Sequence, residues 1–234
     1  MAASIIIPAY NEYSNLTILI EEINLALEGV IDFEIIIVDD CSSDNTQHLF
    51  IENKISNCKI ITNKKNSGQS FSINKGVKNA KYETIITLDA DLQNNPKDIL
   101  DLYNIYISNS NLKLVGGIRA KRKDSFIKII SSKIANKIRM TVLQDQCPDT
   151  GCSLKVFDKK IFLSFPFFDG IHRFLPALFR GYNNETFFVN VDHRARKYGV
   201  SKYGTFKRLF RGIYDLIKVK KILNNYKIND QFHK

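Results

Sequence analysis

The chain has 234 residues, a length that fits one α/β domain better than two, and its hydrophobic fraction of 44% excludes an extensively disordered protein. The four cysteines lack metal-ligand spacing, no run of about 18 apolar residues occurs, and the first residues lack the features of a secretory signal. The net charge is +10, yet residues 1–110 hold 8 Lys and Arg against 15 Asp and Glu, whereas residues 111–234 hold 26 against 9. We therefore expect a reduced, cytoplasmic protein whose acidic half suits a cation and whose basic half suits an anionic partner.

Strand and helix signals alternate through the first half of the chain. Continuous runs of Ile and Val predict strands at residues 4–8, 33–38, 59–62 and 83–88. Apolar residues at helical spacing predict helices at residues 12–27, 69–80 and 96–107, the last with Asn95 as its cap and Pro96 at its first position. This alternation predicts a mainly parallel sheet with helices on both faces and ligands beyond the carboxyl ends of its strands.

The second half of the chain is less regular. It predicts strands at residues 112–118, 151–157 and 186–191, and helices at residues 125–142 and 205–223. The polar stretch 224–234 is expected to fray. We find no linker or repeat, so the sequence predicts a single domain over residues 1–223.

Acidic side chains follow three of the predicted strands. They are Glu12, Asp39, Asp40, Asp89 and Asp91. Carboxyl ends of parallel strands meet at one edge of the sheet, and clustered carboxylates are retained where a cation compensates their repulsion. The Asp-x-Asp pattern at residues 89–91 suits a hard divalent ion, either Mg²⁺ or Mn²⁺, that also binds a nucleoside diphosphate. Alone, the same pattern also fits a helix-capping loop before Pro96.

Four motifs in the first 100 residues resemble the successive motifs of family-two glycosyltransferases. They are SIIIPAYNE, EIIIVDDCSSDNT, the NSG loop with the NKG after it, and TLDADLQ. The resemblance implies a GT-A fold, in which residues 1–110 bind a nucleoside-diphosphate sugar. The nucleotide-binding residues that it implies are Pro8, Tyr10, Glu12, Asp39, Asp40 and Gly68. The catalytic residues and metal ligands that it implies are Asp89, Asp91 and Gln93.

Three motifs of the second half resemble dolichyl- and polyprenyl-phosphate sugar synthases. They are DTGCSLKVFDK, GIHRFLPALFRG and HRARKYGVSKYG. The resemblance implies inverting transfer of a sugar from GDP-mannose or a UDP-sugar to a polyprenyl phosphate held by residues 111–223. Arginine forks and hydroxyl donors suit phosphate recognition. The candidates for holding this phosphate that the resemblance implies are Arg119, Ser132, Arg139, Arg194, Arg196, Ser201 and Lys202.

Two departures from the family pattern affect the site. Cys41 stands where relatives usually have Gly, which is tolerable only if the position does not need a positive φ. The run Asn94-Asn95-Pro96 replaces a more usual Asp-Pro-Pro and removes one carboxylate beside the metal loop. His48, His172 and His233 are not expected to take a direct part in the chemistry.

The last predicted helix has two distinct faces. Phe206, Leu209, Phe210, Ile213 and Ile217 share one face, and basic residues at 207, 208, 211 and 218 lie opposite. This pattern fits either an interfacial helix on an anionic membrane or a surface helix that packs on the core. The first interpretation makes the protein peripheral at the cytoplasmic face of a membrane, with help from an integral membrane partner or a homo-oligomer.

Two other functions fit parts of the sequence. A family-two glycosyltransferase with a saccharide or other non-lipid acceptor would keep the first half and reassign the second. A basic module that binds membrane or nucleic acid would explain the net charge. We expect no nucleic-acid partner, because the carboxylate-lined edge would repel phosphates and stacking motifs are missing from the sequence.

Overall fold

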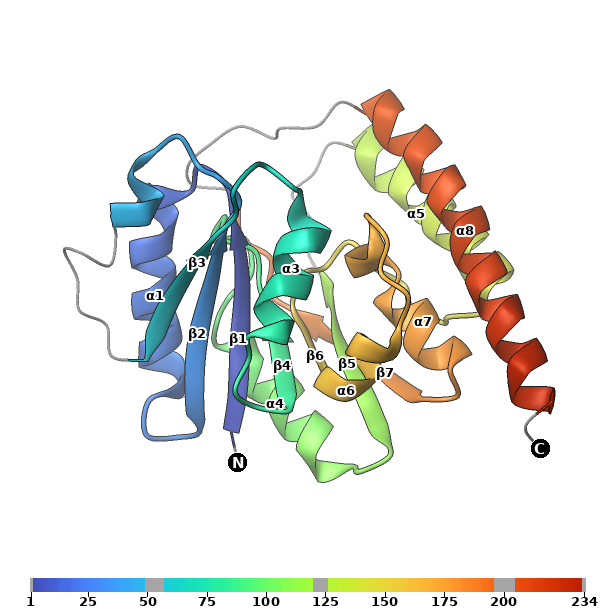
Figure 1. The fold of residues 1–234 in the computed structure, drawn as a ribbon, viewed down its shortest axis with the longest axis horizontal. Coiled ribbons are helices and arrows are strands. Elements are labelled where there is room, and N and C mark those ends of the chain that lie inside the picture. The colour runs from blue at the N-terminus through green and yellow to red at the C-terminus, as the bar shows by residue number, and fades with distance from the viewer. Residues whose placement is uncertain (1, 49–56, 120–125, 196–204, 233–234) are drawn as a thin grey trace.

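The computed structural model describes residues 2–48, 57–119, 126–195 and 205–232, and it describes side chains at 2–46, 57–119, 134–195 and 212–228. A seven-stranded sheet lies at the centre, and helices α5 and α8 lie beyond α7 at one end of the molecule (Figure 1). The predicted α/β fold class is confirmed.

The sheet has the strand order β3-β2-β1-β4-β6-β5-β7. The strands are β1 (Ala2–Ala9), β2 (Asp32–Asp39), β3 (Cys58–Thr62), β4 (Thr84–Thr87), β5 (Leu112–Arg119), β6 (Lys155–Asp158) and β7 (Glu185–Val191). All neighbours pair in parallel except β6, which runs antiparallel to both β4 and β5. This reversal places the start of β6 level with the end of β4, because Lys155 pairs with Thr87.

Helices cover both faces of the sheet. They are α1 (Tyr13–Leu27), α3 (Gln69–Lys78), α4 (Asp98–Ser108), α5 (Phe126–Leu143), α6 (Lys159–Ser164), α7 (Leu175–Gly181) and α8 (Thr205–Phe232), with short 3₁₀ turns η1 (Asn45–His48) and η2 (Ile171–Arg173). Helices α1 and α4 pack on one face, and α3, α6, α7 and α8 pack on the other. Successive side chains of β1 point to opposite faces of the sheet. Ile5 and Ile7 pack in the core under α1 and α4, and Ile6 packs in the core on the other face.

Of the predicted boundaries that differ from the structure, three have a structural reason. Helix α4 begins at Asp98 instead of Pro96, because Asn95 accepts a hydrogen bond from the Lys97 amide in a turn that precedes the helix. Strand β6 is shorter than predicted, because the chain before Lys155 forms a turn around Asp149. Helix α8 extends to Phe232 instead of ending at Leu223, and Tyr226 stacks on Tyr182 with ring centroids 3.8 Å apart.

Helix α8 packs on the core through a face other than the predicted apolar one. Asp215, Val219 and Leu223 are buried, whereas Ile213 and Ile217 are 50% and 66% exposed. Within the described part of the chain, no helix is both long and apolar enough to cross a bilayer. The side chains at 206–211, which complete the predicted apolar stripe, lie outside the described residues.

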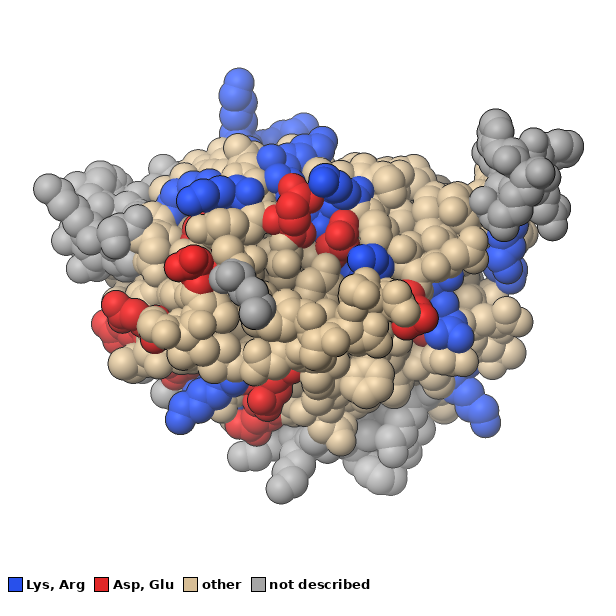
Figure 2. Space-filling model, turned by 90° about the horizontal axis from the view of Figure 1, so that it is seen from below, with Lys and Arg blue, Asp and Glu red and all other residues tan. Residues whose placement is uncertain are grey.

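On one face of the molecule, the charge difference between the halves of the sequence does not separate the two signs. Figure 2 shows the edge of the sheet at which β1 begins, opposite the carboxyl ends of the parallel strands, and there acidic and basic side chains are interspersed among uncharged ones. A basic patch for a polyanion is therefore not visible on this face.

Candidate active site

The loops that follow β1 and β2 bind each other at the carboxyl edge of the sheet. The Asn11 amide donates to Ser42 Oγ at 2.9 Å, and the Ser43 amide donates to Asn11 Oδ1 at 2.8 Å. Asn11 and Cys41 have left-handed backbones with φ of 54° and 63°. Cys41 was expected to avoid a positive φ, and the structure contradicts this, since the exposed residue has a left-handed backbone of the kind that favours glycine.

The two carboxylates after β2 have different surroundings. Asp39 is fully buried, its Oδ1 accepts from the Ser42 amide at 3.1 Å, and its Oδ2 has no partner among the described residues. A buried carboxylate oxygen without a donor is costly, so this oxygen suits a hydrogen-bond donor of a ligand. Asp40 instead accepts from Asn63 Nδ2 and from the amides of Ser67 and Gly68, each at 2.8 Å.

Asp40 therefore holds the glycine loop, although the sequence predicted it in the nucleotide pocket. Gly68 has a φ of 86° and begins helix α3. The other predicted nucleotide-binding residues lie at the same edge. Pro8 and Glu12 are half-buried and Tyr10 is 37% exposed.

The Asp-x-Asp loop follows β4 directly. Asp89 Oδ1 accepts from Gln69 Nε2 at 2.8 Å, and the Asp89 amide donates to Ser153 Oγ at 3.2 Å. Burial and the neighbouring Asp91 carboxylate raise the pKa of Asp89 to about 6. No three acidic, His or Cys side chains of the described residues converge as a complete metal site. A cation here would need further ligands from a substrate or water.

The last predicted metal ligand, Gln93, lies beside the chain after β7. The Arg194 amide donates to the Gln93 carbonyl at 2.8 Å, and His193 pairs with Asn94 in an antiparallel bridge. Asn94, which departs from the family pattern, is buried and accepts from Ser153 Oγ at 2.7 Å. Asn94 Nδ2 also donates to Cys152 Sγ at 3.6 Å, a contact that a carboxylate could not make, so the amide ties the Asp-x-Asp loop to the turn before β6.

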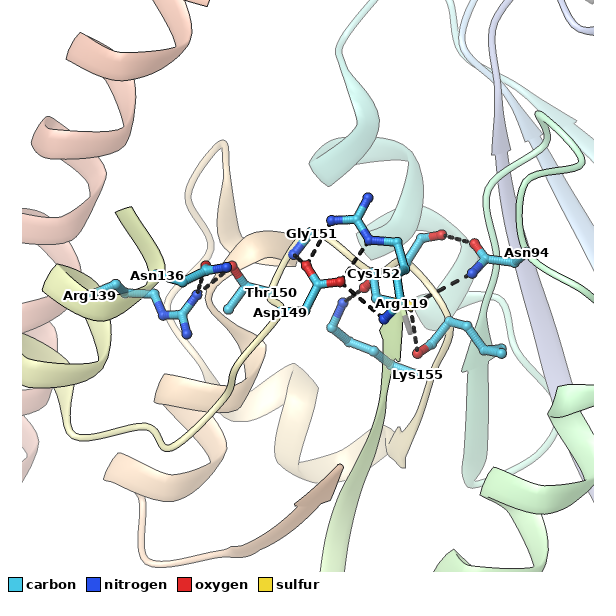
Figure 3. Close-up of polar contacts among 11 residues, drawn as sticks. Asn94, Arg119, Asn136, Arg139, Asp149, Thr150, Gly151, Cys152 and Lys155 are labelled. Atoms are coloured by element: carbon cyan, nitrogen blue, oxygen red, sulfur yellow. Dashed lines mark hydrogen bonds and ion pairs between the residues drawn. The ribbon is translucent and has the colours of Figure 1, made fainter. Parts of the chain in front are cut away.

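Arg119 and Asp149 form a paired fork at the end of β5 (Figure 3). Nε and Nη2 of Arg119 lie 2.7 Å from Oδ2 and Oδ1 of Asp149, respectively. A Cβ atom on Gly151 would lie 2.5 Å from Arg119 Nη2, so a larger residue there would displace the end of the Arg119 side chain from Asp149. The DTG motif thus holds Arg119 in place through Asp149. The positive charge of Arg119 acts on Asp89 and lowers the pKa of that carboxylate.

Two other predicted phosphate ligands form ion pairs within the protein. Arg139 is buried, and it binds Asp145 Oδ2 at 2.7 Å and Thr150 Oγ1 at 2.6 Å. The contact with Thr150, drawn in Figure 3, joins α5 to the turn around Asp149. Arg194 binds both oxygens of Glu22, at 2.9 and 2.7 Å. Ser132, as a side chain, and Arg196, Ser201 and Lys202 lie outside the described residues.

The structure adds three polar residues to the site that the sequence analysis did not select. They are Ser70, Lys155 and His172. Ser70 Oγ lies 2.6 Å from His172 Nδ1, and Lys155 is 96% buried at the start of β6, with 4% of its surface exposed. Lys155 lies within DTGCSLKVFDK and His172 within GIHRFLPALFRG, so the motifs contained them, but only the fold shows that the charge of Lys155 acts on Asp89 and that His172 contacts Ser70.

A family model described as "Glycosyl transferase family 2" matches residues 4–164 of the chain. The fold is similar to that of glucosyl-3-phosphoglycerate synthase from Mycobacterium tuberculosis. Its complex with Mn²⁺, UDP and glucosyl-3-phosphoglycerate has a TM-score of 0.71 and 16% identity over 93% of this chain and 78% of that chain. Its complex with Mn²⁺, UDP-glucose and phosphoglyceric acid has a TM-score of 0.72 and 14% identity over 95% and 80%.

The complex of that enzyme with Mg²⁺ and UDP has a TM-score of 0.71 and 15% identity over 93% of this chain and 77% of that chain. At such identity the likeness establishes the fold alone. The family model covers more than half of the chain, from β1 through α6. Together with the strand order and the carboxylate edge, the match shows that the chain belongs to glycosyl transferase family 2 and is a glycosyltransferase of the GT-A fold.

Proposed function

We propose that the protein transfers a sugar from a nucleoside-diphosphate sugar to the phosphate of a polyprenyl phosphate, with inversion at the anomeric carbon. The observation that most supports this is the division of charge around Asp89. Asp39 and Asp91 lie with it at the carboxyl edge of β2 and β4, and Arg119 and Lys155 act on it from β5 and β6. The carboxylates suit an anionic donor that binds together with a cation, and the basic side chains suit an anionic acceptor.

The donor nucleoside is assigned to the loops after β1 and β2. Asp39 Oδ2 is buried and would accept from a ribose hydroxyl or a base N–H. Asp40 positions Gly68, whose backbone then approaches the diphosphate. This assigns the donor to residues 1–110 and the acceptor to residues 111–223.

A divalent ion, Mg²⁺ or Mn²⁺, fits the residues of the Asp-x-Asp loop. Burial and mutual repulsion disfavour the ionised form of Asp89, and a cation between Asp89 and Asp91 would relieve both effects. Gln93 would add an amide oxygen. When bound, such an ion supplies positive charge opposite the leaving diphosphate. The likeness to an enzyme solved with Mn²⁺ or Mg²⁺ and UDP supports this assignment.

The acceptor chemistry needs orientation more than deprotonation. A phosphate monoester has a second pKa of about 6, so its oxygen is already anionic at neutral pH. That oxygen would form a bond to the anomeric carbon while the bond to the diphosphate oxygen breaks. Arg119 would orient the phosphate, and a His172 whose pKa is near 3 could not act as a base at neutral pH.

Helix α8 supports an acceptor at a membrane surface. Ile213, Tyr214 and Ile217 are at least half exposed, and Lys221 is exposed beside them. Apolar and basic side chains on one outward face suit the interface of an anionic bilayer. The helix lies at one end of the molecule, beside α5 and α7 (Figure 1).

A second candidate is a small phosphorylated acceptor. It is favoured by the similarity to glucosyl-3-phosphoglycerate synthase, whose complexes contain phosphoglyceric acid. The test is a panel of GDP-mannose, UDP-glucose and a UDP-uronic acid, each with undecaprenyl phosphate, 3-phosphoglycerate or a neutral saccharide, with Mg²⁺, Mn²⁺ or EDTA. We expect metal-dependent product from undecaprenyl phosphate. Product from 3-phosphoglycerate alone would favour the second candidate, and product from the saccharide alone would exclude both.

A further inference from the structure

A buried lysine lies beside the Asp-x-Asp loop without a carboxylate partner. Lys155 is 4% exposed, and its ammonium donates to the Cys152 carbonyl. It forms no ion pair with any residue that the structure describes. Lysine is seldom buried unless its charge is paired, and an ammonium has three N–H donors, of which one carbonyl uses only one. Two N–H donors of the ammonium are therefore left without a partner among the described residues and can bind an anion.

A histidine near this lysine has a defined proton position. The buried Ser70 hydroxyl accepts from the Gly170 amide at 2.8 Å and lies 2.6 Å from His172 Nδ1. The hydroxyl has one proton of its own and no other acceptor among the described residues, so it donates this proton to Nδ1. Nδ1 is then the acceptor, and Nε2 carries the ring proton.

The environment keeps this imidazole neutral. Burial and the charges of Arg173 and Lys155 lower the pKa of His172 to about 3. The ring is half-buried, and Nε2 has no hydrogen-bond partner within the part of the chain that the structure describes. His172 is therefore a neutral N–H donor at physiological pH.

Helix α3 links this donor to Asp89. Ser70 follows Gln69, whose Nε2 donates to Asp89 Oδ1 at 2.8 Å. The charge of Lys155 acts on both Asp89 and His172, so the ammonium lies near both side chains. Strand β6 fixes this position, because Lys155 pairs with Thr87, two residues before Asp89.

We propose that Lys155 Nζ and His172 Nε2 form an anion subsite beside Asp89 that binds a non-reacting oxygen of the acceptor's phosphate. Lys155 is buried and His172 is half-buried, and both offer N–H donors, of which the cationic ammonium favours an anionic oxygen over a neutral hydroxyl. The inference rests on the proposed function only in that the acceptor is phosphorylated. A lipid phosphate and a small phosphate monoester share this chemistry.

Histidine ¹⁵N spectroscopy tests the subsite without turnover. The chain has four histidines, and His172→Gln identifies the signal of His172. With UDP and Mg²⁺ present, we expect an unprotonated Nδ1 and a protonated Nε2 from pH 6 to pH 8. Glycerol 3-phosphate or geranyl phosphate should shift the Nε2 signal, and glycerol should not. A shift with geranyl phosphate alone would indicate a lipid phosphate, and a shift with glycerol 3-phosphate alone would indicate a small phosphate monoester. An Nδ1–H tautomer, or a signal that neither phosphate moves, would overturn the proposal.

Paired substitutions separate binding from structure. His172→Gln keeps an amide donor near the Nε2 position, whereas His172→Asn keeps only the contact near Nδ1 with Ser70. If Nε2 binds the acceptor, the Gln variant should retain a lower acceptor KM than the Asn variant. A purely structural role predicts the reverse order.

Lysine 155 has a matched control in the same segment. Lys159 also donates to a single carbonyl, that of Ala80 at 2.6 Å, at the opposite end of β6. Lys155→Met should raise the KM for the phosphorylated acceptor by about tenfold to a hundredfold and leave the Kd for UDP or GDP within about twofold, with partial rescue by Lys155→Arg. Lys159→Met should change neither constant. Loss of nucleotide affinity in Lys155→Met at unchanged acceptor KM would contradict the subsite. If the enzyme uses no phosphorylated acceptor, the proposed function fails, and the spectroscopic test still decides whether the subsite binds phosphate.

Discussion

At the scale of single residues, the carboxylates of the edge differ in what they can still bind. Both oxygens of Asp40 accept hydrogen bonds from the glycine loop, and Asp39 retains one buried oxygen without a partner among the described residues. The pKa of Asp89 is raised by burial and by the neighbouring Asp91. Asp91→Asn should lower turnover by about 10²-fold or more, because a charge opposite the diphosphate is lost. EDTA should have the same effect on the native protein, and the exposed Asp101→Asn should be neutral. Full turnover in EDTA would refute the metal assignment.

The raised pKa of Asp89 gives a prediction about stability. Its folded-state pKa of about 6 lies above its ordinary value of 3.8, so the folded state binds this proton more tightly than the unfolded state. The ionised carboxylate therefore reduces stability as pH rises from about 4 to about 6. Without metal, Asp89→Asn should raise the melting temperature at pH 7.5 and have a smaller effect at pH 5. An equal shift at both pH values would show that Asp89 is not perturbed.

Arg139 tests the distinction between a phosphate ligand and a buried ion pair. Arg139→Ala leaves the fully buried Asp145 without its partner, which costs about 3–5 kcal/mol of unfolding free energy. Urea unfolding measures this loss. A variant that keeps native stability but has a raised acceptor KM would restore the role implied by the family resemblance.

At the scale of elements, the packing of α3 on β1 depends on the glycine of the NKG motif. A Cβ atom on Gly76 would lie 2.5 Å from Ile6 Cγ2, whereas a Cβ on Gly212 in α8 meets no atom within 4 Å. Gly76→Ala should lower the unfolding free energy by about 1–3 kcal/mol through overpacking. Gly212→Ala should raise it by up to about 1 kcal/mol through helix propensity. Equal effects in thermal unfolding would contradict this account of the helix–strand contact.

The outward face of α8 predicts binding to membranes. Sedimentation with liposomes should rise with anionic lipid content and fall with salt. It should weaken in Ile217→Ser and Lys221→Gln, whose side chains are exposed, without a change in melting temperature. Leu25→Ser provides the control, because Leu25 is 86% exposed on α1. If the native protein does not bind anionic liposomes at low salt, α8 does not attach the protein to a bilayer by itself.

At the scale of the whole molecule, the order of the elements and the carboxylate edge were predictable, because buried parallel strands read as apolar runs and acidic residues follow them. The direction of β6 was not predictable, since periodicity does not encode whether a strand runs parallel or antiparallel. Arg194 was predicted as a phosphate ligand, but its partner Glu22 is 172 positions away. Ser70 and His172 are 102 positions apart. Such pairings exist only after folding, so sequence alone showed the motifs but not their partners.

In the proposed reaction, the anomeric carbon of a donor sugar becomes bonded to a phosphate oxygen of a polyprenyl phosphate. The direct measurement is ¹³C and ³¹P NMR of the product formed from a donor labelled with ¹³C at the anomeric carbon, with undecaprenyl phosphate and Mg²⁺. We expect coupling between the labelled carbon and a single phosphorus in the lipid product, with anomeric configuration opposite to that of the donor. Label found only in free sugar or in a product without phosphorus, or a retained configuration, would contradict the proposed reaction.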